Sequence, residues 1–301
     1  MKQSEVFYKF PYWLQLVCLF LVMVGCLLVS ANIAALFAAL LFGMDSLNQA
    51  LPLLFVQAVS VTGGFLLPSL WFAHMQKAGI PDYPAAKKGF SLKLLGGAVS
   101  AYLLLCPFIS ALQEWNAGWH FPERWLTLEE YFRNKSLQAE LLSQKMLLTD
   151  SWGTFLCAIA VVAIGAGVCE EFFFRGCLQN IFRGWFKNVH AAVWVCAALF
   201  SLFHGDFFGF LPRLFLGALL GYLYVWSGSL WVPVIVHTLN NTVLATAFFL
   251  HHNGYIAFSP ENLEHAPHWS IVLISIVLCA GVCRLMTKNA GDTPQSPSSR
   301  S

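Results

Sequence analysis

The chain has 301 residues, of which 58% are apolar and 11% are charged. A water-soluble domain has about a quarter of its residues charged, because its surface faces water. The composition therefore excludes a soluble fold and indicates a surface that faces membrane lipid. The net charge of +2 is small and dispersed, so we expect no nucleic-acid partner.

Apolar runs of roughly 20 residues, enough to cross about 30 Å of hydrocarbon, follow one another along the sequence. We predict eight, at about 12–43, 51–75, 94–112, 153–185, 189–205, 208–226, 230–250 and 269–286. The first exceeds a signal-peptide core of about 7–15 residues and is expected to be retained. The fifth is barely long enough. The predicted fold is an all-α polytopic membrane protein, a bundle of about eight transmembrane helices forming a single domain, 1–286.

Two polar segments interrupt or follow these runs. In segment 113–152, the stretch Trp125–Leu148 mixes apolar and charged residues. It predicts an amphipathic helix on the membrane surface or over the bundle, and a simple connector is an equal alternative. Residues 287–301 are rich in Ser and Pro, and we expect a disordered cytoplasmic tail there.

Lysine and arginine in short loops indicate the orientation of the bundle. With the N-terminus inside, the cytoplasmic side receives Lys2, Lys9, Lys77, Lys87, Lys88, Lys93, Arg183, Lys187, Arg284, Lys288 and Arg300. The loops at 44–50 and 251–268 contain no Lys or Arg. We expect an integral, multi-pass protein of the plasma (inner) membrane with both termini in the cytoplasm.

Ionisable residues inside the predicted spans point to a functional site, because a charge at the centre of a membrane helix costs roughly 2.5–3.5 kcal/mol. They occur together with two amides in the second half of the chain: Glu170, Glu171, Arg175, His204, Arg213, His237, Asn240 and Asn241.

Helical spacing assigns these residues to faces. Glu171 and Arg175 are four residues apart and are expected to pair. Glu170 lies about 100° round the helix, so it is the carboxylate left for general base chemistry. His237 and Asn241 are one turn apart and are suited to holding a carbonyl oxygen as charge develops on it.

Each of these residues also has a structural interpretation. The Glu171–Arg175 pair can serve packing alone, a histidine at a span end such as His204 is commonly interfacial, and Asn240 and Asn241 can join helices. Together, however, three helices supply a carboxylate, two imidazoles and an amide. That combination favours hydrolysis over packing.

The three clusters resemble the motifs of a known family. Glu170-Glu171-Phe172-Phe173-Phe174-Arg175, Phe200 to His204, and His237 to Asn241 are similar to the E-E-x-x-x-R, F-x-x-x-H and H-x-x-x-N motifs of the CPBP intramembrane proteases. This family includes the type II CAAX prenyl endopeptidases and bacterial relatives linked to bacteriocin processing or self-immunity. The resemblance covers about residues 155–250.

The resemblance implies a membrane-embedded endopeptidase whose helical bundle encloses a water-filled cavity. Glu170 would activate the hydrolytic water with help from His204, and His237 and Asn241 would stabilise the oxyanion. Glu171 and Arg175 would hold the site together. The implied substrate is a peptide or membrane protein, with or without an attached lipid.

Two questions stay open. Glu170, His204 and His237 are also a plausible three-ligand zinc site, although we favour metal-independent catalysis without a cofactor. The alternative functions are a non-proteolytic membrane scaffold or a bacteriocin-immunity or regulatory protein of the same fold. A transporter is less favoured, because the sequence has no evident inverted repeat.

Overall fold

The protein is described here by a computed structural model that covers residues 7–76, 89–260 and 265–291. Within these ranges the chain is helical and has no β-strand. The α-helices are α2 (Tyr12–Phe42), α3 (Ala50–Val61), α4 (Leu67–Met75), α5 (Leu92–Ala117), α6 (Leu126–Leu147), α7 (Trp152–Ala158), α8 (Ala166–Glu171), α9 (Gln179–Phe186), α10 (Val189–Phe203), α11 (Phe210–Ser227), α12 (Trp231–His252) and α13 (Trp269–Gly291). Short 3₁₀ segments are η1 (Met44–Ser46) and η3 (Glu123–Trp125), and π-helical segments are η2 (Thr62–Leu66), η4 (Ile159–Gly165) and η5 (Phe172–Leu178).

The predicted polytopic membrane bundle is confirmed. In the described part of the chain, seven helical stretches are long and apolar enough to cross a membrane: Tyr12–Phe42, Ala50–Met75, Leu92–Ala117, Trp152–Phe186, Phe210–Ser227, Trp231–His252 and Trp269–Lys288. The protein is therefore an integral, multi-pass membrane protein.

The span predicted at 189–205 differs from the other seven. Helix α10 has 15 residues, or about 22 Å at 1.5 Å per residue, which is less than the hydrocarbon thickness. Turn residues limit its length. Lys187 adopts a left-handed φ of 49°, the Asn188 side chain caps the helix by accepting from the Ala191 N–H, and Gly205 follows its end with a φ of 66°.

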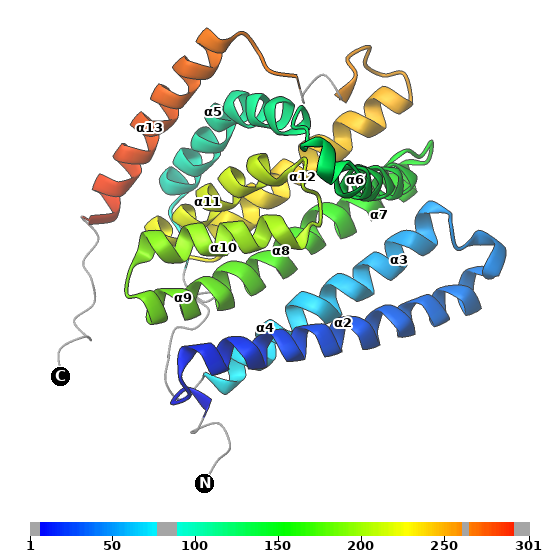
Figure 1. Ribbon diagram of the computed structural model, residues 1–301, viewed down its shortest axis with the longest axis horizontal. Coiled ribbons are helices and arrows are strands. Elements are labelled where there is room, and N and C mark those ends of the chain that lie inside the picture. Colours follow the sequence, from blue (N-terminus) through cyan, green and yellow to red (C-terminus); the bar gives the residue numbers. More distant parts are fainter. Residues whose placement is uncertain (1–6, 77–88, 261–264, 292–301) are drawn as a thin grey trace.

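The helices run back and forth between two ends of the bundle (Figure 1). The start of α2, the end of α4, the start of α5 and the ends of α9 and α13 lie toward the same side. These element ends carry or adjoin the described members of the predicted cytoplasmic set, Lys9, Lys93, Arg183, Lys187, Arg284 and Lys288. The remaining members, Lys2, Lys77, Lys87, Lys88 and Arg300, lie outside the described residues. The cytoplasmic orientation stays a prediction.

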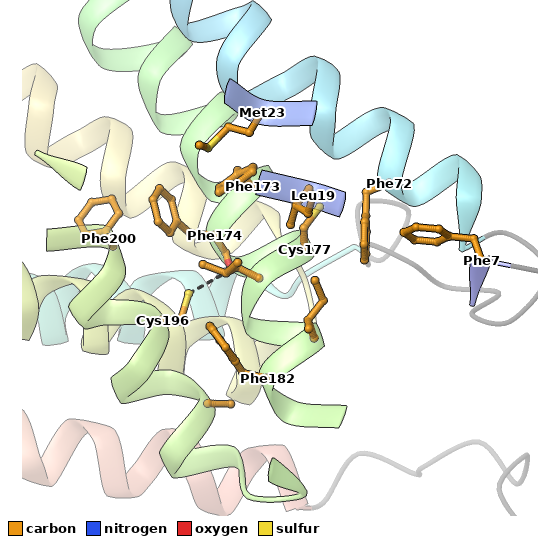
Figure 2. Close-up of a cluster of buried hydrophobic side chains, with 13 residues drawn as sticks. Phe7, Leu19, Met23, Phe72, Phe173, Phe174, Cys177, Phe182, Cys196 and Phe200 are labelled. Carbon is orange, nitrogen blue, oxygen red and sulfur yellow. Dashed lines mark hydrogen bonds between the residues drawn. The ribbon is translucent and has the colours of Figure 1, made fainter. Parts of the chain in front are cut away.

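Two clusters of buried apolar side chains hold the bundle together. One joins α2, α4, η5, α9 and α10 (Figure 2). In it the rings of Phe173, Phe174 and Phe200 meet edge to face, with centroids 5.2–5.3 Å apart. The other joins α5, α11, α12 and α13. Helix α8 packs against α12, and it continues through η5 into the first cluster.

Segment 113–152 contains a helix that packs against the bundle. Helix α6 contacts α3, α7 and α12, so the interpretation as a simple connector is wrong. At the other end of the chain, α13 continues to Gly291. The helix therefore includes the first residues of the predicted tail, 287–291, and the division of the chain at 286 stays a prediction. Residues 292–301 of the predicted tail lie outside the described residues.

Candidate active site

Glu170 and Glu171 end helix α8, between the π-helical segments η4 and η5. A π-helical turn shifts the faces of the helix that follows it and is frequent at functional sites. Glu171 is fully buried, whereas Glu170 is half-buried. The two adjacent carboxylates therefore have different surroundings, as their angular separation predicts.

Gly167 allows α8 to approach α12 closely. A Cβ atom at this position would lie 2.5 Å from Thr238 Oγ1 and 3.2 Å from the Thr238 backbone nitrogen. The second contact is to backbone, which cannot rotate away as a side chain can. The absence of a side chain at Gly167 is thus what lets the end of α8 reach His237.

Glu171 joins two basic groups through one oxygen atom. Its Oε1 lies 2.7 Å from Arg175 Nη1 and 2.9 Å from His237 Nδ1. Arg175 also donates from Nη2 to the Gly217 carbonyl at 2.8 Å. The structure contains the Glu171–Arg175 pair that the spacing predicts. It adds the contact to His237, which the sequence analysis did not anticipate.

The ring of Phe200 lies against three members of the predicted site. The Arg175 guanidinium is 4.7 Å from the ring centroid, and the His204 and His237 rings are 4.9 and 5.7 Å away. Phe200 is itself buried. This ring therefore packs against side chains from η5, α10 and α12 and contacts both imidazoles.

Both histidines use Nδ1 for a structural hydrogen bond. His204 Nδ1 lies 2.8 Å from the Phe200 carbonyl, which can only accept, so Nδ1 carries the proton. The same argument applies to His237 Nδ1 beside the Glu171 carboxylate. In each ring Nε2 is then the atom left for chemistry. His204 is exposed whereas His237 is buried.

Glu170 lies near His204, close enough for the two groups to interact electrostatically. Its Oε2 is buried and has no hydrogen-bond partner among the described residues. A buried carboxylate oxygen without a donor is uncommon, because the desolvation of a polar atom is normally offset by a hydrogen bond. Glu171 Oε2 is unpaired in the same way, but Glu171 is fully buried and its Oε1 already contacts Arg175 and His237, whereas Glu170 is half-buried.

Asn241 lies one turn beyond His237. Its Nδ2 donates to the Val162 carbonyl at 3.1 Å, and its Oδ1 accepts from Asn240 Nδ2 at 3.0 Å. An amide nitrogen has two hydrogens. The second N–H of Asn241 has no hydrogen bond within the described part of the chain and is available to a bound carbonyl oxygen.

A turn between α10 and α11 carries His204, and side chains on both sides hold it. Asp206 Oδ2 pairs with Arg213 Nη1 at 2.7 Å, and Asp206 Oδ1 accepts from Ser136 Oγ of α6 at 2.6 Å. Buried Asn116 donates to the Phe207 carbonyl and accepts from the Leu211 N–H. Arg213 thus closes a turn, and sequence spacing alone did not reveal its partner Asp206.

The alternative metal set is not gathered as a ligand cluster. In the ranges that the structure covers, no group of three or more His, Cys, Asp and Glu side chains is placed to hold a metal ion. Glu170, His204 and His237 do not form such a group in this conformation.

Comparison with known families matches the part of the chain that holds this site. Residues 152–243 match the family model described as type II CAAX prenyl endopeptidase Rce1-like. These residues form an Rce1-like domain. The domain contains all six predicted site residues, Glu170, Glu171, Arg175, His204, His237 and Asn241, and it excludes α2 to α6. Searches of curated proteins and of solved structures gave no match to the chain. The match supports a similarity to CAAX-type membrane proteases at the level of the family.

Proposed function

We propose that this protein is an intramembrane endopeptidase in which Glu170 and His204 activate a water molecule for attack on a peptide bond. The observation that carries the proposal is the buried, unpaired Oε2 of Glu170, close enough to His204 for an electrostatic interaction, in an Rce1-like domain. A positioned general base of this kind contributes about 10²- to 10⁴-fold to a reaction rate.

The proposed reaction balances as a hydrolysis. Glu170 takes a proton from water while the water oxygen bonds to the carbonyl carbon of the peptide. The carbonyl oxygen becomes an oxyanion and accepts from the second N–H of Asn241. The C–N bond then breaks, and the leaving nitrogen receives the proton held by Glu170, with His204 Nε2 assisting the transfer.

His237 donates to the oxyanion from Nε2 only when its ring is protonated, because Nδ1 already carries the other proton. The Glu171 carboxylate beside Nδ1 stabilises that protonated ring. Arg175 and the ring of Phe200 hold Glu171 and His237 in place. Glu171 and Arg175 are therefore proposed as supporting residues and not as groups that touch the substrate.

The first probe is a farnesylated peptide with a C-terminal CAAX sequence, together with the same peptide without the lipid. Purified protein in liposomes is incubated with each, and the products are identified by mass spectrometry. The proposal predicts endoproteolytic cleavage of the farnesylated probe by wild-type protein and its loss in Glu170→Ala. The unmodified peptide reports whether the lipid is needed.

Two results would overturn the proposal. One is the absence of cleavage by the folded wild-type protein, and the other is equal cleavage by wild-type and Glu170→Ala proteins. Absence of cleavage would favour the non-proteolytic alternative, a membrane scaffold or a bacteriocin-immunity or regulatory protein. Equal cleavage would show a protease that does not use Glu170 as its base. Glu130→Ala, on the exposed surface of α6, is the matched control for loss of a carboxylate.

A further inference from the structure

A chain of hydrogen bonds reaches the proposed site from a helix outside the Rce1-like domain. Tyr102 of α5 donates from its hydroxyl to Asn240 Oδ1 at 3.2 Å. Asn240 Nδ2 donates to Asn241 Oδ1 at 3.0 Å, and Asn241 Nδ2 donates to the Val162 carbonyl at 3.1 Å. Tyr102 is buried, so its hydroxyl has little access to solvent.

The direction of this chain fixes two amide groups. A side-chain amide can rotate so that its oxygen and nitrogen exchange places. The Val162 carbonyl can only accept, so the Asn241 nitrogen faces it and Asn241 Oδ1 faces Asn240. Asn241 Oδ1 requires a donor, which is Asn240 Nδ2. Asn240 Oδ1 then faces Tyr102, whose hydroxyl donates to it and holds Asn240 in this orientation. The second N–H of Asn241 has no hydrogen bond among the described residues.

We propose that Tyr102 is a positioning residue that holds the Asn241 amide in its donor orientation through Asn240. The inference rests on the proposed function, since it assigns to Asn241 the donor for the oxyanion. It extends the site beyond residues 152–243 to a helix that the family match does not include. Asn240, which is not a motif position, becomes the link between them.

The kinetic test uses Tyr102→Phe, which removes the hydroxyl and keeps the ring. With the farnesylated CAAX peptide as probe, kcat falls about 3- to 10-fold, the range that corresponds to one neutral hydrogen bond, and KM is unchanged. The matched control is Tyr224→Phe. Tyr224 is also a buried tyrosine, and its hydroxyl accepts from Asn180 at 3.0 Å. This variant keeps the wild-type kcat.

A second pair of variants separates positioning from general packing. In an Asn241→Ala background there is no amide to orient, so adding Tyr102→Phe causes no further loss of kcat. An equal fold-loss of kcat in both backgrounds would overturn the inference. So would a wild-type kcat in Tyr102→Phe alone.

Thermal unfolding in detergent tests the hydrogen-bond chain without any activity. Tyr102→Phe and Asn240→Ala remove the same bond, so their losses in Tm do not add. Additive losses would overturn the chain itself. The wild-type protein could cleave no probe while the Tm losses are non-additive. In that case the proposed function fails, and the catalytic role given to Tyr102 fails with it. The orientation of the two amides would still be supported.

Discussion

His237 Nδ1 lies 2.9 Å from Oε1 of Glu171, on the oxygen atom that also pairs with Arg175. The two residues are 66 positions apart in the sequence and come from α12 and α8. This contact joins two motifs that would otherwise be independent. It explains why a fully buried ion pair is placed here, since the carboxylate both balances Arg175 and sets the proton position of His237.

Glu171→Gln tests this dual role. The change leaves the buried Arg175 without a counter-charge, and removal of one partner of a buried pair costs about 3–5 kcal/mol. We expect a large loss of Tm and of cleavage. The double variant Glu171→Met, Arg175→Leu should recover much of the Tm, because an apolar pair avoids the desolvation cost. It should not recover cleavage, since His237 still lacks its carboxylate. Recovery of cleavage would show that Glu171 serves packing alone.

Phe200 is predicted to matter for catalysis beyond its contribution to stability. Phe200→Leu keeps an apolar side chain but removes the ring that contacts Arg175, His204 and His237. Phe173→Leu is the control, since Phe173 is equally buried in the same cluster and, among the described residues, its ring contacts Phe20, Phe65 and Phe174. We expect similar losses of Tm and a fall in kcat for Phe200→Leu alone. Equal kcat values in the two variants would contradict this role.

We expect acid to destabilise the segment around Glu129, which covers the turn that carries His204. Its carboxylate accepts from the Phe121 N–H at 2.7 Å, from Arg133 Nε and from His120 Nδ1, and these bonds lower the pKa of Glu129 to about 2. A lowered carboxyl pKa adds stability above the ordinary value of 4.5 that is lost as the pH falls through about 2.

The measurement is the difference in Tm between wild-type protein and Glu129→Gln across this pH range. We expect the difference to be largest above about pH 5 and to vanish toward pH 2. The exposed neighbour Glu130 provides the control, as Glu130→Gln should give no such trend. A difference that does not change with pH would show that the Glu129 charge does not hold this segment.

Removal of metal separates the two mechanisms that the sequence permits. We expect cleavage by wild-type protein to persist after exhaustive chelation, with no stoichiometric metal found by elemental analysis. Cleavage that is lost on chelation and restored by zinc would instead assign Glu170, His204 and His237 as zinc ligands.

The sequence predicts the local parts of this architecture well. Apolar runs separated by polar residues are sufficient to predict the membrane helices, and a spacing of four is sufficient to predict the Glu171–Arg175 pair. The short α10 has visible signals in Asn188 and Gly205, but an apolar run alone does not show where a helix stops. The Tyr102–Asn240 bond depends on which helices become neighbours, and spacing along one helix carries no such information.

The role of Glu170 as the base is tested most directly by the single-turnover cleavage rate of Glu170→Gln. The rate is measured with enzyme in excess over the farnesylated CAAX peptide. Gln keeps the shape of the side chain but cannot accept the proton from water. We expect a folded protein, with a Tm close to that of wild type, whose cleavage rate is lower by about 10²- to 10⁴-fold, while Glu130→Gln cleaves at the wild-type rate. A Glu170→Gln rate equal to that of wild type would contradict the assignment of Glu170 as the base.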